Sequence, residues 1–163
     1  MLTEKTACHT GRFSYKEGCR IVLKLVFLTK DFYNDFSKCP EIENKDQRPY
    51  IRVHVNIGGV LWGIPLRSHI SHNHVIWTDE ENGCGIDFTK AVVISNPALY
   101  ISGTKPHLRD DEFKVLKRID EFQLKTKFQR YIKEYKKAKQ HPEMKRNKML
   151  LNFSTLQYFE EYI

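Results

Sequence analysis

Residues 50–66 read YIRVHVNIGGVLWGIPL, and this stretch decides the fold class of the first half of the chain. Apolar residues at positions 51, 53, 55 and 57 alternate with more polar residues at the even positions, which is typical of a strand with one buried face. Gly58-Gly59 is a hairpin turn signal, and residues 60–66 return as the partner strand. The stretch therefore predicts an antiparallel β-hairpin.

Segments on both sides of this hairpin extend the predicted sheet. Residues 21–27 are mostly apolar and predict a first strand, and Thr29 is suited to begin a short helix in which Phe32 and Phe36 share a face. Residues 75–78 and 91–94 flank a glycine-rich turn and predict a further antiparallel pair. The first half is thus expected to form an antiparallel sheet.

The second half has helical periodicity. Acidic residues 110–112 favour a helix start, and apolar residues at 113, 116, 119, 122, 128, 132 and 135 continue one stripe until His141-Pro142. Residues 150–156 predict a last strand, or a turn and short helix. We expect one α+β domain over residues 1–163, in which residues 1–20 show no period and form a flexible extension.

Charge favours an anionic partner. The net charge is +7, and residues 105–148 hold 15 Lys/Arg against 7 Asp/Glu. Nucleic acid is one candidate, a membrane surface is another, and a basic protein without such a partner is the plain alternative. The apolar run at 21–28 is interrupted by Lys24 and is too short to span a bilayer. The four scattered cysteines and the lack of a signal peptide predict a cytoplasmic protein.

The densest cluster of reactive residue types is Arg67-Ser68-His69-Ile70-Ser71-His72-Asn73-His74, directly after a predicted strand. Three interpretations compete. A zinc site lacks a nearby cysteine or carboxylate at a familiar spacing. A polar turn without special function is the second interpretation. The third is a ribonuclease site without metal, in which histidine transfers protons and arginine binds the phosphate charge.

Further candidate residues each have a structural alternative. Tyr33 lies in an aromatic-rich helix and is expected to pack in the core. Arg48 precedes a proline in a loop, and its side chain is expected to be solvated there. Lys90 is a candidate RNA-binding residue, and a simple strand-flanking charge is its structural alternative. Arg52 and His54 share the polar face of a strand and contact either RNA or water.

Several runs together resemble the toxins of type III toxin–antitoxin systems, most closely the TenpN branch of the ToxN/AbiQ family. They are RPYIRV at 48–53, GIPLRSH at 63–69, CGIDFTKAVVI at 84–94 and the ending NFSTL at 152–156. The resemblance covers the chain from about residue 21 to its end. It implies a strongly twisted antiparallel sheet with surrounding helices, SH3-barrel-like and related to the Kid/MazF toxins.

The resemblance also implies a function. Such toxins are endoribonucleases that use no metal or other cofactor and leave 2′,3′-cyclic phosphate ends. They act in phage defence on cellular or phage RNA. A repeated RNA pseudoknot, which the toxin itself processes, inhibits the enzyme as the antitoxin in a toxin–RNA hetero-oligomer.

Individual residues are assigned from the same resemblance. Ser68 matches the family's serine after Pro-Leu-x, Tyr33 approximately matches a tyrosine of the first helix, and Arg48 falls where ToxN proteins carry a lysine. Two positions depart from the pattern: Arg67 stands in place of a threonine, and Ile70 in place of a lysine.

The missing acid or base is therefore assigned to His69 or His72, with His69 favoured because it adjoins Ser68. Lys133, Lys136 and Lys137, on the basic helical half, are expected to bind the antitoxin RNA. The alternatives are a non-catalytic RNA-binding module and, less favoured, a zinc-dependent hydrolase.

Overall fold

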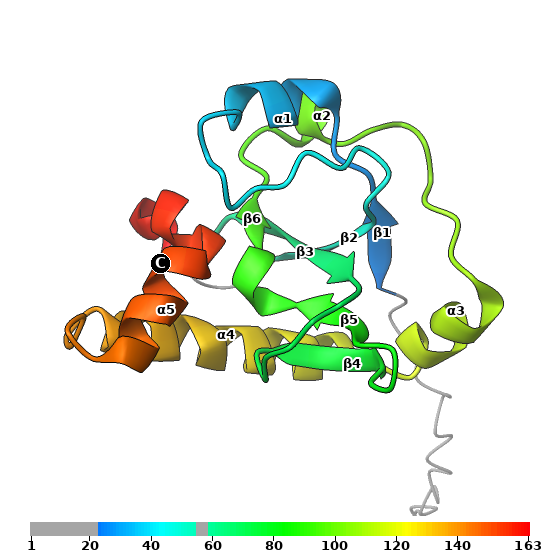
Figure 1. Ribbon diagram of the computed structural model, residues 1–163. Coiled ribbons are helices and arrows are strands. Elements are labelled where there is room, and N and C mark those ends of the chain that lie inside the picture. The colour runs from blue at the N-terminus through cyan, green and yellow to red at the C-terminus, as the bar shows by residue number, and fades with distance from the viewer. Residues whose placement is uncertain (1–22, 55–58) are drawn as a thin grey trace, which may run out of the picture.

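The computed structural model describes residues 23–54 and 59–163, and within them the chain is an α+β fold (Figure 1). The expected extension at 1–20 lies outside the described residues. The elements in chain order are β1 Lys24–Val26, α1 Lys30–Asp35, β2 Tyr50–His54, β3 Leu61–Arg67, β4 Val75–Asp79, β5 Cys84–Asp87, β6 Val92–Val93, α2 Pro97–Tyr100, α3 Asp110–Leu116, α4 Glu121–Ala138 and α5 Lys145–Phe153.

Strand β3 is the centre of an antiparallel sheet of order β1-β2-β3-β5-β4, and β6 also pairs with β3. The hairpin predicted from residues 50–66 is confirmed, with Tyr50 opposite Pro65 and His54 opposite Leu61. Its turn residue Gly58 lies outside the described residues, as do residues 21 and 22 of the predicted first strand. In the described part of the chain, edge strands β1 and β4 do not pair, so the sheet is open.

The predicted pairing of residues 75–78 with 91–94 is wrong. β4 pairs instead with β5, the segment between them, and β6 pairs with the first half of β3. The cause is that the chain already turns at residues 80–83 and returns as Cys84–Asp87, a strand that the sequence interpretation had assigned to the turn. Gly85 is required there, because a Cβ atom would lie 2.6 Å from the carbonyl oxygen of Ile76.

The long helix α4 covers one face of the sheet. Its buried residues include Leu124, Phe128 and Tyr131, and the Phe128 ring meets Trp62 of β3 edge to face at 5.2 Å. The stripe predicted from 113 to 135 is two helices rather than one, because the Asp120 side chain accepts a hydrogen bond from the backbone N–H of Phe122 and begins α4 afresh. Phe122 is 75% exposed and lies off the stripe.

Helices α1 and α2 lie together at the opposite end of the sheet from α4 (Figure 1). Thr29 begins α1 as predicted, with its side chain accepting from the N–H of Phe32. The segment 150–156 is the end of α5 and a following 3₁₀ turn, so the helical alternative is correct and the strand alternative is wrong. None of the helices among the described residues is long and apolar enough to span a membrane.

Candidate active site

A pocket of about 920 Å³ opens between the loop after β3, the 3₁₀ turn that follows β5, and helix α5. It brings together residues that lie far apart in the sequence, among them four of the predicted site residues. The lining residues are Glu41, Glu43, Arg67, His69, Ile70, Ser71, His72, His74, Thr89, Lys90, Lys145, Arg146, Met149, Leu150, Phe153 and Ser154.

A fully buried carboxylate, Asp87 at the end of β5, organises the floor beneath this pocket. Its oxygens accept hydrogen bonds from the backbone N–H and the hydroxyl of Thr89 and from Arg67 Nη1, at 2.6–2.9 Å. Burial alone raises the pKa of the carboxyl, but hydrogen bonds from His72, Thr89 and Arg67 outweigh burial and lower that pKa to about 2. Asp87 is therefore a fixed negative charge.

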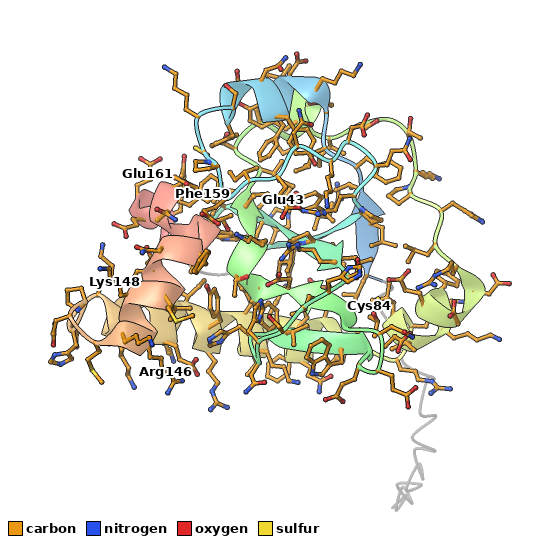
Figure 2. The ribbon with its side chains drawn as sticks, viewed as in Figure 1. Glu43, Cys84, Arg146, Lys148, Phe159 and Glu161 are labelled. Atoms are coloured by element: carbon orange, nitrogen blue, oxygen red, sulfur yellow. The ribbon has the colours of Figure 1, made fainter. Side chains whose placement is uncertain are left out.

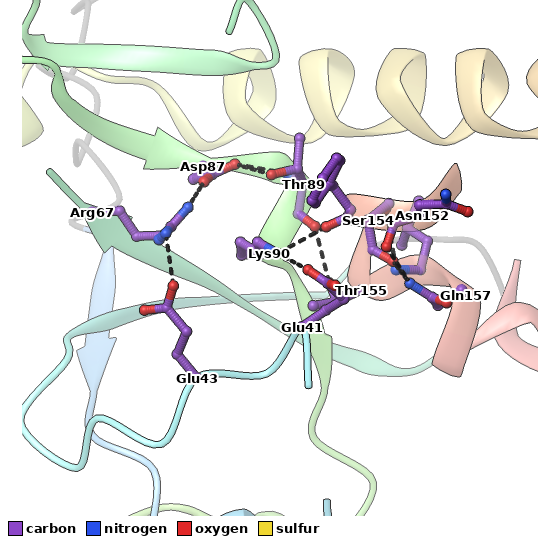
Figure 3. A network of polar contacts seen from close by, with 12 residues as sticks. Glu41, Glu43, Arg67, Asp87, Thr89, Lys90, Asn152, Ser154, Thr155 and Gln157 are labelled. Atoms are coloured by element: carbon purple, nitrogen blue, oxygen red, sulfur yellow. Dashed lines mark hydrogen bonds and ion pairs between the residues drawn. The ribbon is translucent and has the colours of Figure 1, made fainter. Parts of the chain in front are cut away.

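Arg67 links this buried carboxylate to a second one (Figure 3). Its Nη2 lies 3.1 Å from Oε1 of Glu43, and Glu43 also binds Arg48, whose Nη2 is 2.7 Å from Oε2. The hydrogen bond from Arg48, with further contributions from Lys45 and Arg67, lowers the pKa of Glu43 to about 2. Since both terminal nitrogens of Arg67 bind carboxylates, Arg67 is part of the pocket's framework.

Lys90 holds helix α5 against the same floor. Its Nζ donates to Glu41 at 2.6 Å and to the backbone carbonyl of Phe153, the last residue of α5, at 2.8 Å. The Thr155 hydroxyl, just after the helix, lies against the backbone carbonyls of Thr89 and Ala91, of which the Ala91 carbonyl is the nearer acceptor. The ending NFSTL thus ties the C-terminal helix to the turn after β5.

His69 has an unusual backbone conformation, with φ of +59°. Left-handed φ is uncommon for residues other than glycine, although histidine adopts it more readily than most. Both Ser68 and His69 are exposed, with 3.0 Å between Ser68 Oγ and His69 Nδ1, and only His69 of the two lines the pocket. The other ring nitrogen, Nε2, has no hydrogen-bond partner among the described residues and remains available to a ligand.

His72 lies deeper and is held at both ring nitrogens. Its Nδ1 accepts from the backbone N–H of His74 at 3.3 Å, so the neutral ring carries its proton on Nε2. That Nε2 lies 3.3 Å from the Thr89 hydroxyl and 3.4 Å from Asp87. Burial lowers the pKa of His74, although the nearby negative charge of Glu134 acts to raise it.

The free cations of the pocket are on α5. Lys145 and Arg146 are exposed and line the pocket, and neither forms an ion pair within the part of the chain that is described. Figure 2 shows Arg146 on α5, at the end of the molecule remote from α3. The sequence interpretation missed both as site residues, together with Asp87, Glu41 and Glu43. The run Lys145–Lys148 was a usable signal, but its position beside the loop after β3 depends on the tertiary fold.

Other predicted residues lie outside the pocket. Tyr33 is 3% exposed and donates its hydroxyl to the carbonyl of Lys45 at 2.9 Å, which is a core position. Arg48 is nearly buried and reaches the pocket only through Glu43, which corrects the interpretation of a solvated loop residue. Arg52 and His54 lie on β2 and do not line the pocket.

The lysines predicted to bind RNA, Lys133, Lys136 and Lys137, are exposed on α4 but do not line the pocket. A second hollow of about 360 Å³ adjoins the pocket and shares His74 and Arg146 with it. Its α4 cations are Lys127 and Arg130.

Within residues 23–54 and 59–163, no three His, Cys, Asp or Glu side chains are arranged to hold a metal ion. Searches of protein families, curated proteins and solved structures find no match for this chain.

Proposed function

We propose that the chain is an endoribonuclease toxin of the type III toxin–antitoxin class and that the pocket beside α5 is its active site. The observation that carries the proposal is the meeting of His69, His72, Lys145 and Arg146 in one pocket. Imidazoles supply proton transfer near neutral pH, and free cations balance the charge of a phosphate. The same proposal includes that the sheet is SH3-barrel-like and that the chain is related to the Kid/MazF toxins.

The proposed chemistry uses the ribose itself as nucleophile. His69 Nε2 takes the proton of the 2′-hydroxyl, and the O2′–P bond forms as the P–O5′ bond breaks. Both ring nitrogens of His72 are already engaged, so a solvent water gives a proton to O5′ and recovers one from the protonated His69 ring; the products are a 2′,3′-cyclic phosphate and a 5′-hydroxyl. Lys145 and Arg146 bind the charged phosphate oxygens, and Ser68 supports the His69 ring.

The proposed partner is a repeated RNA pseudoknot in a cytoplasmic complex. Its backbone would follow the exposed cations of α4 and α5, which hold most of the surplus charge. The second candidate is an RNA-binding module without catalysis. It is favoured by the engagement of both Arg67 arms with carboxylates, since this removes one cation from any reacting phosphate.

Incubation of the purified protein with end-labelled single-stranded RNA, and with DNA of the same sequence, tests the proposal. We expect cleavage of the RNA alone, with cyclic phosphate at the new 3′ ends, and the same rate in the presence of EDTA. RNA left intact would favour the binding module. Cleavage abolished by EDTA and restored by zinc would instead assign a metal hydrolase.

A further inference from the structure

Helix α5 forms an apolar wall on one side of the pocket. Met149 and Phe153 lie four residues apart, so they share a face of the helix, and both line the pocket. They are 54% and 59% exposed, although Leu150 beside them is partly covered. An adjacent pair of large apolar side chains, open to a pocket, differs from scattered exposed apolar residues that need no explanation.

Charged groups surround this wall. Lys145 and Arg146 lie one to two turns earlier on the same helix, and Lys90 lies at its C-terminal end. Helix α5 reads KRNKMLLNF, with three cations and no acidic residue. An apolar surface beside free cations matches a nucleotide, which joins a flat ring to an anionic phosphate. A second copy of this chain, with net charge +7, would be repelled.

The Phe153 ring is carried on a fixed backbone. Its carbonyl accepts from Lys90 at 2.8 Å. The next residue, the buried Ser154, accepts from the Tyr131 hydroxyl at 2.6 Å, and its own side chain begins the following 3₁₀ turn. A side chain whose backbone is already ordered loses less conformational entropy when a ligand binds.

We propose that Phe153 is a stacking platform for one unpaired nucleobase of a single-stranded RNA, with Met149 against the edge of the same base. Lys145 and Arg146 then bind the adjoining phosphates. This inference rests on the proposed function for the identity of the ligand. Base–aromatic stacking tolerates many sequences, because every base has a flat face, so the subsite selects single strands over duplexes.

Binding of uncleavable strands tests the subsite. The probes are a fluorescently labelled 2′-fluoro RNA of mixed sequence, which lacks the attacking hydroxyl, and an abasic strand of equal length. We expect the wild type to bind the base-bearing strand about 5- to 150-fold more tightly, the range that corresponds to one stacked base. Phe153→Ala should lose most of this preference with affinity for the abasic strand unchanged, and Phe153→Trp should retain it.

Two controls sharpen the measurement. Phe122→Ala removes a more exposed phenylalanine outside the pocket, at 75% exposure, and should bind both strands as the wild type does. Phe153→Leu keeps an apolar cover without a ring. Equal binding by Phe153→Leu and wild type would overturn stacking in favour of apolar contact, and an unchanged preference in Phe153→Ala would overturn the subsite altogether.

The outcomes also separate this inference from the proposed function. If the base preference depends on Phe153 but the wild type leaves RNA intact, the stacking subsite stands and the nuclease proposal fails. If the wild type cleaves RNA and Phe153→Ala binds both strands like the wild type, the nuclease proposal stands and the subsite fails.

Discussion

Arg67 and Asp87 form an ion pair, with 2.6 Å between Nη1 and Oδ2, that joins β3 to the end of β5. The carboxylate is fully buried and the arginine side chain is 19% exposed. Through its second arm, the same guanidinium reaches Glu43 in the loop before β2. One residue thereby ties three separate segments to the floor of the pocket.

Replacement of Asp87 by asparagine should destabilise the protein strongly. A neutral amide at this position cannot balance the Arg67 charge, so we expect a loss of about 3 kcal/mol in the free energy of unfolding, the lower end for a broken buried ion pair because Arg67 is partly solvated. Chemical denaturation measures the loss. Asp111→Asn, which changes an exposed carboxylate, is the control, and equal stability of the two variants would refute the structural role.

Acid should destabilise the fold through the same carboxylates. Both have a folded-state pKa of about 2, below their ordinary values of 3.8 for Asp87 and 4.5 for Glu43. Because the pKa values are lowered, the stabilisation is complete above about pH 4.5 and is lost as the pH falls toward 2. Thermal unfolding across this range should show the loss, and Asp87→Asn should flatten it. A variant at an exposed carboxylate, Glu81→Gln, should retain the wild-type slope.

The His69 ring should be required for RNA cleavage and for toxicity. We expect His69→Ala to lower the cleavage rate about 10²- to 10⁴-fold, as for loss of a general acid or base. His69→Asn should be equally inactive while it tolerates the positive φ, which separates chemistry from loop conformation. His107→Ala, at an exposed histidine outside the pocket, should cleave normally. Full activity of both His69 variants would place the chemistry elsewhere.

Cations at the pocket and cations on α4 should have separable effects. Lys145→Glu with Arg146→Glu should slow cleavage of short RNA about ten- to hundredfold, because charged hydrogen bonds to phosphate are removed. Lys133, Lys136 and Lys137 changed together to Glu should leave that rate unchanged. The triple variant should weaken binding of long antitoxin RNA and reduce the salt slope by about 0.7 for each phosphate that the protein no longer neutralises. If the triple variant and the wild type showed parallel salt slopes and equal affinity, these lysines would be solvated surface residues that do not bind the antitoxin.

Some helix boundaries are set by neighbouring residues alone, and others are not. The Thr29 cap was readable because capping involves neighbours only, and the helix stop before His141 follows from Pro142 in the same way. The split between α3 and α4 was missed, although Asp120 is a suitable cap, because apolar spacing runs through it. The exposure of Phe122 follows from the same split, because the buried residues of the new helix, among them Leu124 and Phe128, lie on the opposite face from Phe122.

The sequence by itself determined the hairpin of β2 and β3, the antiparallel character of the first half and the basic helical second half. These features follow from a two-residue alternation, turn residues and charge, all of which act between near neighbours. Only the tertiary structure decided that Arg67 would bind two carboxylates, and that Lys145, Arg146 and Phe153 would line the same pocket as His69. Such contacts join residues 20 or more positions apart, and they depend on strand register and on the packing of α4 and α5, which no local pattern encodes.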